Sequence, residues 1–188
     1  MKKLNPSLVG FIIALLVSVI SLVVYFQYIQ KESYYLIDNP TKASLNVFID
    51  DNSYVISPGQ QVKVDLEKGE HSLRVASDVD SLNFEESTFK VSQVRGMINP
   101  TRSVYFIYGL PYGPTVDKDS IYTNLKATYQ GKTYLGDVEI DSAHYTEDFY
   151  YNIDENYPRL ALRSDNKSLR KKIFRIADFK QFYFENYE

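Results

Sequence analysis

The chain of 188 residues contains no cysteine and no tryptophan, and it has only two histidines. The absence of cysteine excludes a disulfide framework and any thiolate metal site. His71 and His144 fit neither a His-x-x-x-His nor a His-Glu-x-x-His pattern, so the sequence predicts no metal site. Glycine-rich phosphate loops and the Gly-x-Ser-x-Gly elbow are missing too, and we predict no cofactor.

An excess of positive charge is also missing. The formal net charge is −3, with Lys2 and Lys3 at the N-terminus and all 24 acidic residues from Glu32 onward. Because proteins that bind nucleic acid usually carry a basic face, we predict no nucleic-acid partner.

Apolar and aromatic residues, by contrast, are plentiful. They make up 44% and 15% of the chain, and tyrosine alone occurs 17 times. Tyrosine and phenylalanine favour strands over helices. Outside the longest apolar run about 150 residues remain, which is the size of one ordinary domain with its own core.

The longest apolar run predicts a transmembrane helix over residues 8–29. Leucine, isoleucine, valine and phenylalanine fill 15 of these positions, and no charge occurs between Lys3 and Lys31. At the rise of an α-helix, the run spans about 33 Å, enough for the hydrocarbon core of a bilayer. Lys2 and Lys3 place residues 1–7 in the cytoplasm and the domain outside, so we predict a single-pass protein of the cytoplasmic (inner) membrane.

A cleaved signal peptide is the alternative interpretation of this run. Its apolar region is usually about 7–15 residues long and ends at a small-x-small cleavage site. Here the run is longer and continues into Tyr25-Phe26-Gln27-Tyr28-Ile29, which contains no small residue. The pattern therefore favours an uncleaved signal-anchor.

The small residues of the apolar run share one face of the predicted helix. They are Ser7, Gly10, Ala14, Ser18 and Ser21. At 100° per residue they fall within an arc of about 80°. Faces of this kind let two helix backbones approach closely in lipid. We predict that the helix packs on a membrane protein partner or on a second copy; the alternative is a plain anchor in which the small residues align by chance.

Beyond a predicted linker at residues 30–42, short segments of alternating polarity predict a mainly β domain over residues 43–188. Leu45, Val47 and Ile49 alternate with polar neighbours, and turn residues recur at close intervals. This pattern is typical of an antiparallel β-sandwich. A sub-boundary is placed near residues 92–100, and no internal repeat is evident.

Two shorter elements complete the predicted domain. Residues 124–135 form a hairpin that turns at Gln130-Gly131-Lys132. Residues 177–188 form a short C-terminal amphipathic helix with a Phe and Tyr face.

Part of the domain resembles a known family. The residues concerned are Val47-Phe48-Ile49-Asp50-Asp51, Pro58-Gly59 and Leu66-x-x-Gly69-x-His71-x-Leu73-x-Val75. Over about residues 45–75 this pattern resembles the PEGA-type β-sandwich repeats of bacterial envelope and surface proteins. The Pro-Glu-Gly-Ala tetrapeptide itself is absent, and Ser57-Pro58-Gly59 stands in that region. The resemblance implies an extracytoplasmic β-module and carries over no catalytic residue.

Two groups of charged residues are candidates for binding. Asp137, Glu139 and Asp141 alternate along one predicted strand. The basic cluster comprises Lys167, Arg170, Lys171, Lys172 and Arg175. Charged faces are normally solvated. The functional interpretation is that the two groups bind each other or a partner, with lipid phosphates as an anionic partner for the basic cluster.

These features predict a membrane-anchored, non-enzymatic envelope protein that acts as a binding or scaffold module. The alternative is an anchored enzyme that uses carboxylates to act on envelope carbohydrate. Its candidate residues are Asp137, Glu139, Asp148, Asp154 and Glu155. No catalytic pair is singled out, because the sequence does not show which carboxylates lie together in space.

Overall fold

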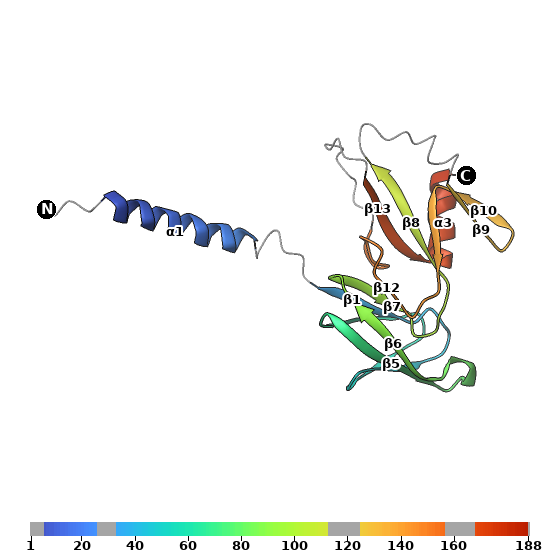
Figure 1. Cartoon of the computed structure of the whole chain (residues 1–188). Helices are drawn as coiled ribbons and strands as arrows, with labels where there is room; N and C mark the ends of the chain where they lie inside the picture. Colours follow the sequence, from blue (N-terminus) through green and yellow to red (C-terminus); the bar gives the residue numbers. More distant parts are fainter. Residues whose placement is uncertain (1–5, 26–32, 113–124, 157–167, 188) are drawn as a thin grey trace. The chain divides into compact units, whose positions relative to one another are not determined.

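The computed structural model describes residues 6–25, 33–112, 125–156 and 168–187 (Figure 1). The chain divides into two compact units, Met1–Glu32 and Ser33–Glu188.

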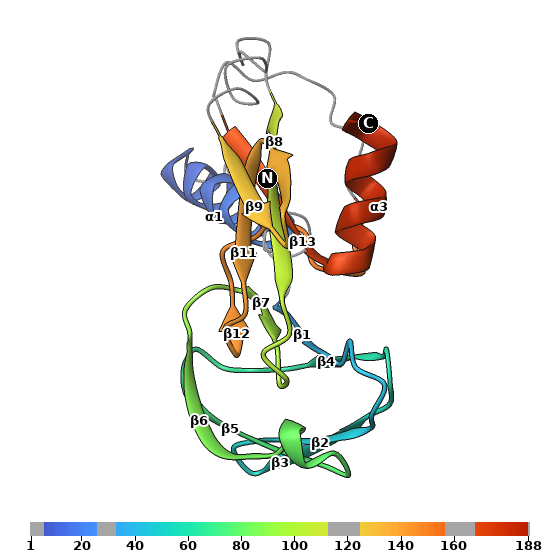
Figure 2. The same cartoon turned by 90° about the vertical axis from the view of Figure 1, so that its right-hand side faces the viewer.

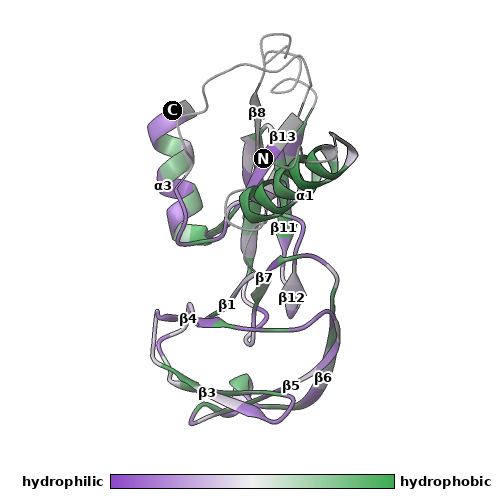
Figure 3. Ribbon diagram, turned by 90° about the vertical axis from the view of Figure 1, so that its left-hand side faces the viewer, coloured by the Kyte–Doolittle hydropathy of each residue, from purple (hydrophilic) through white to green (hydrophobic). Residues whose placement is uncertain are grey.

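The first unit contains helix α1 (Pro6–Val24), which is apolar along its whole length (Figure 3). Its stretch Ser7–Val24 is long and apolar enough to cross a membrane, a test that a signal sequence near the N-terminus also passes. Its large apolar side chains are between 38% and 65% exposed. The predicted helix is therefore present, and its predicted end at Ile29 lies outside the described residues.

The second unit is mainly β. Its described strands are β1 (Tyr34–Asp38), β2 (Leu45–Ile49), β3 (Asn52–Ile56), β4 (Gln61–Val64), β5 (Gly69–Ser77), β6 (Phe84–Val91), β7 (Arg95–Ile98), β8 (Tyr105–Tyr112), β9 (Lys126–Tyr129), β10 (Lys132–Leu135), β11 (Asp137–Asp141), β12 (Tyr145–Thr146) and β13 (Ser168–Arg175). A 3-10 turn, η2 (Asp80–Leu82), and the terminal helix α3 (Ile176–Tyr187) are the described helical elements. The antiparallel, sandwich-like fold with a short C-terminal helix is confirmed.

The strands form stacked layers (Figures 1 and 2). The central sheet has the order β12-β7-β1-β4, and one face of it packs on the sheet β3-β2-β5-β6. The other face packs on the sheet β11-β8-β13. Neighbouring residues of β7 show this division, because Ile98 belongs to the first core and Met97 to the second. The hairpin β9–β10 and helix α3 cover the far side of β8 in a third core.

The second unit contains an internal repeat. In the N-terminal repeat β1 pairs with β4, and β2 pairs with β3 and β5. In the C-terminal repeat β7 pairs with β12, and β8 pairs with β11 and β13. The repeats therefore have the same strand order and pairing, and the β9–β10 hairpin is an insertion in the second. In sequence only the turns Asn39-Pro40-Thr41-Lys42 and Asn99-Pro100-Thr101-Arg102 reveal it.

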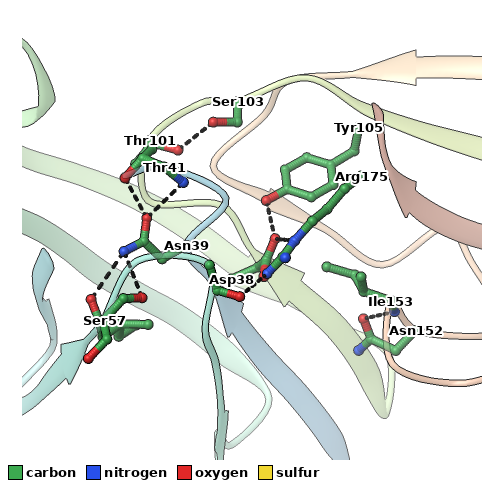
Figure 4. A network of polar contacts seen from close by, with 12 residues as sticks. Asp38, Asn39, Thr41, Ser57, Thr101, Ser103, Tyr105, Asn152, Ile153 and Arg175 are labelled. Carbon is green, nitrogen blue, oxygen red and sulfur yellow. Dashed lines mark hydrogen bonds and ion pairs between the residues drawn. The ribbon is translucent and has the colours of Figure 1, made fainter. Parts of the chain in front are cut away.

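A buried asparagine organises the equivalent turn of each repeat. The Nδ2 of Asn39 donates to the carbonyl oxygens of Ala43 (2.8 Å), Ile56 and Ser57, while its Oδ1 accepts from Thr41 (Figure 4). The Nδ2 of Asn99 donates to the carbonyl oxygens of Ser103 (2.7 Å) and Ala143 (3.1 Å). Both side chains are fully buried, so these hydrogen bonds satisfy polar groups of the turn that water does not reach.

Two predicted boundaries need correction. The predicted linker 30–42 contains β1, whose Tyr35, Leu36 and Ile37 are buried between β4 and β7. The Asn39-Pro40 turn is thus internal to the domain. Residues 92–100 do not separate compact units either, because β7 lies beside β1 in a sheet that both repeats share.

The predicted hairpin at residues 124–135 is confirmed for its described part, β9 and β10. Gln130 (φ 51°) and Gly131 (φ 80°) form its turn in the left-handed region. Two consecutive residues with positive φ match the twist of a tight hairpin.

Candidate functional site

The basic cluster does not form one surface. Alternate residues of β13 point to opposite faces of its sheet, so Lys171 and Arg175 diverge from Arg170 and Lys172. Each of the four is already bound within the domain: Arg170 donates to the Tyr151 hydroxyl at 2.9 Å, and the partners of the other three follow below. These four residues therefore do not share one face of the sheet, an anionic partner for the basic cluster stays a prediction, and Lys167 lies outside the described residues.

Arg175 joins the two repeats. Its guanidinium binds Asp38 through Nε at 3.0 Å and through Nη2, and Nη2 also donates to the carbonyl oxygen of Gly59 (Figure 4). The Tyr105 hydroxyl donates to the same carboxylate at 2.6 Å. The hydrogen bond to Asp38 raises the pKa of Arg175, and burial raises the pKa of Tyr105. Asp38 is fully buried, which indicates a structural joint.

Lys172 also has a structural role. It is 6% exposed, and its Nζ donates to the carbonyl oxygens of Asn152 (2.7 Å), Ile153 (3.1 Å) and Glu155. Burial lowers the pKa of Lys172 to about 8. The ammonium group thereby fixes the segment after Tyr151 against the edge of β13.

Three of the five carboxylate candidates lie around one lysine. The Nζ of Lys171 is 2.7 Å from both Glu139 and Asp148, so one predicted acidic residue does bind a residue of the basic cluster. Burial raises the pKa of Asp137; the negative charges of Glu139 and Asp148 add to this, and Lys171 opposes it.

The other two carboxylate candidates lie in a separate network. Asp154 accepts a hydrogen bond from Tyr34, and Glu155 pairs with Arg95. The structure thus separates the five candidates into two groups. Among the residues that the structure describes, no group of three or more ligating side chains fits a metal ion.

The five small residues of α1 follow the spacing that the sequence indicates. The hydroxyl of Ser18 donates to the carbonyl oxygen of Ala14 at 2.9 Å, so this polar group is satisfied within the helix. A methyl group added at Gly10 would meet no atom within 4 Å. The helix surface at this position is open.

No pattern in the sequence indicates the groove that lies between β6 and the segment 143–148. We call it the sandwich groove. Its volume is about 620 Å³. Its lining residues are Ser87, Thr88, Phe89, Lys90, Arg102, Ala143, His144, Tyr145, Thr146, Glu147 and Asp148. Both walls are sheet edges, since β6 ends the outer sheet and β12 ends the central sheet.

Aromatic side chains pack where the two walls of the sandwich groove meet. Phe89 stacks on Tyr145 with ring centroids 4.9 Å apart, and Phe84 contacts His144 at 4.6 Å. Burial and the charge of Arg102 lower the pKa of His144, against the hydrogen bond to the Asn99 carbonyl, so His144 is neutral at pH 7. The wall contacts are therefore apolar and uncharged.

Glu147 lines the sandwich groove and is held by several hydrogen bonds. Its carboxylate accepts from the backbone N–H groups of Ser92 and Gln93, both at 3.0 Å, and from the Tyr145 hydroxyl at 2.9 Å. Burial alone would raise the pKa of Glu147, but these hydrogen bonds outweigh it and lower the pKa. Glu147 is thus ionised and already fully engaged.

The positive charges of the sandwich groove are not engaged in this way. Lys90 and Arg102 are exposed, and neither side chain forms an ion pair or hydrogen bond with any other residue that the structure describes. Asp148, the remaining acidic lining residue, pairs with Lys171. The lining therefore combines two basic side chains with the ionised Glu147, and Glu70 on β5 lies directly opposite Lys90.

Comparison with protein-family models, with curated proteins and with solved structures finds no match for this chain. The resemblance of residues 45–75 to PEGA-type repeats therefore stays a prediction. In the structure these residues form β2 to β4 and most of β5.

Proposed function

We propose that this chain is a membrane-anchored, non-enzymatic binding module of the cell envelope. In this proposal α1 is an uncleaved signal-anchor in the inner membrane, residues 1–7 are cytoplasmic, and residues 33–188 form the extracytoplasmic domain. The observation that carries the proposal is the sandwich groove, along which β6 and β12 each have an outer edge with no strand partner among the described residues. Such a surface suits recognition of another protein.

The helix supports the same role. We propose that the face of Gly10, Ala14 and Ser18 packs on a membrane partner or a second copy, because small residues let helix backbones meet closely in lipid. The Gly10→Ile/Ala14→Ile variant should lose the partner. The Val9→Ile/Val23→Ile variant adds bulk on the opposite side of the helix and should retain it.

The test is purification of the tagged full-length protein in mild detergent after cross-linking in native membranes. A reproducible membrane partner, or a cross-linked dimer, that is lost only in the Gly10→Ile/Ala14→Ile variant supports the proposal. A protein that washes off membranes in carbonate and begins near residue 30 would refute the anchor. A monomer that captures nothing would refute the binding role.

The carboxylate group around Lys171 supports a second candidate function, a hydrolase of envelope carbohydrate. Glu139 and Asp148 both lie 2.7 Å from the same Nζ. The raised pKa of Asp137 suits a general acid. If this function is correct, the full-length protein should hydrolyse purified envelope glycan, and Asp137→Asn should abolish the activity. The absence of hydrolysis by the wild-type protein would reject this candidate.

A further inference from the structure

His71, on β5, links two separate turns of the N-terminal repeat. Its Nδ1 lies 2.6 Å from Oδ2 of Asp50, in the turn between β2 and β3. Its Nε2 lies 2.8 Å from the carbonyl oxygen of Glu67, in the segment 65–68 that joins β4 to β5. An ionised carboxylate and a carbonyl oxygen can only accept hydrogen bonds, so both ring nitrogens have to donate. The form of the side chain that satisfies both contacts is the imidazolium.

The contact with Asp50 is the fixed end of this link. The Oδ1 of Asp50 accepts a hydrogen bond from the backbone N–H of Ser72 at 2.9 Å, and the backbone N–H of Asp50 donates to the carbonyl oxygen of Ser72 at 3.2 Å. Burial alone would raise the pKa of Asp50, but the hydrogen bonds from His71 and Ser72 outweigh it and lower the pKa. Asp50 is therefore ionised at neutral pH and stays bound to β5.

The segment 65–68 is the loose end. Among the hydrogen bonds that its residues form with other described residues, the structure records the one from His71. Three of its four residues are exposed, and Leu66 is half-buried against the first core. The segment ends at Gly69, whose φ of 146° favours glycine, and a methyl group added there would meet no atom within 4 Å. Gly69 is thus a hinge with open space around it.

The charges that face His71 favour its protonated form. Asp50 and Glu67 are both acidic, and β6 presents the uncharged ring of Phe89, with ring centroids 5.5 Å apart. Burial alone would lower the pKa of His71, but the hydrogen bonds to Asp50 and to the Glu67 carbonyl outweigh it and raise the pKa above 6.5. The imidazolium therefore loses its proton only as the pH rises above that value.

The other titratable groups nearby do not compete in this range. Glu70 and Lys90 form the adjacent cross-strand pair, and because side chains alternate along a strand they lie on the other face of the sheet. Lys68 is exposed. Across the sandwich, Tyr35 and Tyr145 contribute to the same core, and burial raises the pKa of each, so both stay neutral.

Loss of the proton breaks one end of the link. A neutral imidazole donates from one nitrogen only, and the carboxylate of Asp50 is the stronger acceptor. The lone pair of Nε2 then faces the carbonyl oxygen of Glu67, and this contact becomes repulsive. We propose that His71 is a proton-operated latch, which holds the segment 65–68 closed and releases it about Gly69 when the proton leaves. This device does not depend on the binding function proposed above.

The test is a spin label on the latched segment. Because the chain contains no cysteine, Lys68→Cys provides a single labelling site in the full-length protein in detergent micelles. Electron paramagnetic resonance from pH 5 to pH 9 gives the ratio of mobile to immobile label. The ratio should rise about tenfold with pH, since a hydrogen bond from a charged donor is lost. A label at Lys126→Cys, on β9, is the matched control and should show no change.

Three variants of the Lys68→Cys protein assign the transition. His71→Gln does not titrate, so its ratio should be the same at every pH. His144→Gln removes the other histidine and should leave the transition as it is. Asp50→Asn keeps a side chain that tolerates the left-handed backbone at this position (φ 51°) but removes the negative charge. Its transition should move to lower pH by about one unit.

A ratio that does not change with pH while His71 is present would overturn the inference. A transition that persists in His71→Gln, or that Asp50→Asn leaves at the same pH, would do so as well. An equal change of the label at Lys126→Cys would also overturn it, because the pH would then loosen the whole domain rather than the segment 65–68.

Discussion

The two repeats of the domain share their strand order and pairing but differ in what covers their outer faces. On β2 this face carries Asn46 and Phe48, and the guanidinium of Arg74 lies 3.9 Å from the Phe48 ring. The equivalent residues of β8, Phe106 and Tyr108, are fully buried beneath α3 and the β9–β10 hairpin. The same strand arrangement therefore has a solvent-facing outer surface in the N-terminal repeat and a covered one in the C-terminal repeat. The difference lies in the two outward side chains of β2 and β8 and in the presence of α3 and the β9–β10 hairpin.

The largest expected effect breaks the covered face. Phe179 of α3 is fully buried and stacks on Phe106 with centroids 4.4 Å apart. Phe179→Ala should lower the free energy of unfolding by about 3–5 kcal/mol, since it leaves a cavity. Urea denaturation of the full-length protein in detergent measures this. Phe48→Ala, at the uncovered face, should cost less than about 1 kcal/mol; equal costs would contradict the comparison.

A somewhat smaller effect is expected at the joint between the repeats. Asp38→Asn retains the shape of the side chain but leaves Arg175 without its ion pair. The expected loss is about 3 kcal/mol, because the partner charge stays in a largely buried position. The same denaturation experiment tests it. Asp141→Asn, at a half-buried position in the C-terminal repeat, serves as a control and should change stability by less than about 0.5 kcal/mol.

The paired asparagines allow the equivalence of the repeats to be tested directly. Asn39→Ala and Asn99→Ala should each cost about 2–3 kcal/mol, since both leave buried carbonyl groups without donors. Asn39→Ala should cost more, because the two N–H groups of Asn39 are shared among three carbonyl oxygens and those of Asn99 serve two. Thermal unfolding monitored by circular dichroism gives the order. If only one substitution destabilises the domain, the two turns are not equivalent.

The smallest expected effect is a difference in pH dependence between the repeats. Burial alone would lower the pKa of His71, but the Asp50 carboxylate at 2.6 Å and the Glu67 carbonyl outweigh it and raise the pKa above 6.5. The stability that His71 contributes is therefore complete below pH 6.5 and declines as the pH rises through the folded-state value. For His144 the pKa is lowered, so its contribution is complete above pH 6.5 and declines as the pH falls.

Melting temperatures measured from pH 5 to pH 8 test this pair. His71→Gln should remove part of the decline on the alkaline side, and His144→Gln should remove part of the decline on the acidic side. Slopes that change in the same direction for both variants would contradict the assignment.

The elements that could be predicted from the sequence are those whose structure depends on neighbouring residues. The uncharged apolar run predicted α1, and the alternation of Leu45, Val47 and Ile49 predicted β2. Gly131 indicated the hairpin turn. Strand β1 was not predicted, because its five residues do not alternate between apolar and polar side chains. They are buried because β4 and β7 flank them, and the local sequence does not show this.

The candidate site was less predictable for the same reason. From the sequence alone, Lys171, Lys172 and Arg175 look like one basic patch. Their binding partners are remote in sequence: Asp38, for example, lies 137 positions from Arg175. The sandwich groove combines the edge of β6 with residues 143–148. Only the repeated Asn-Pro-Thr turn was visible in the sequence as a clue to the duplicated arrangement.

The position of β1 determines how the domain responds to mechanical load. Any pull on the chain ahead of the domain enters it at Tyr34, the first residue of β1, which is hydrogen-bonded along both edges to β4 and β7. A tension directed along this strand loads its flanking hydrogen bonds in shear, so they must rupture together rather than one after another. Because β7 pairs with β1, the same load also reaches the C-terminal repeat.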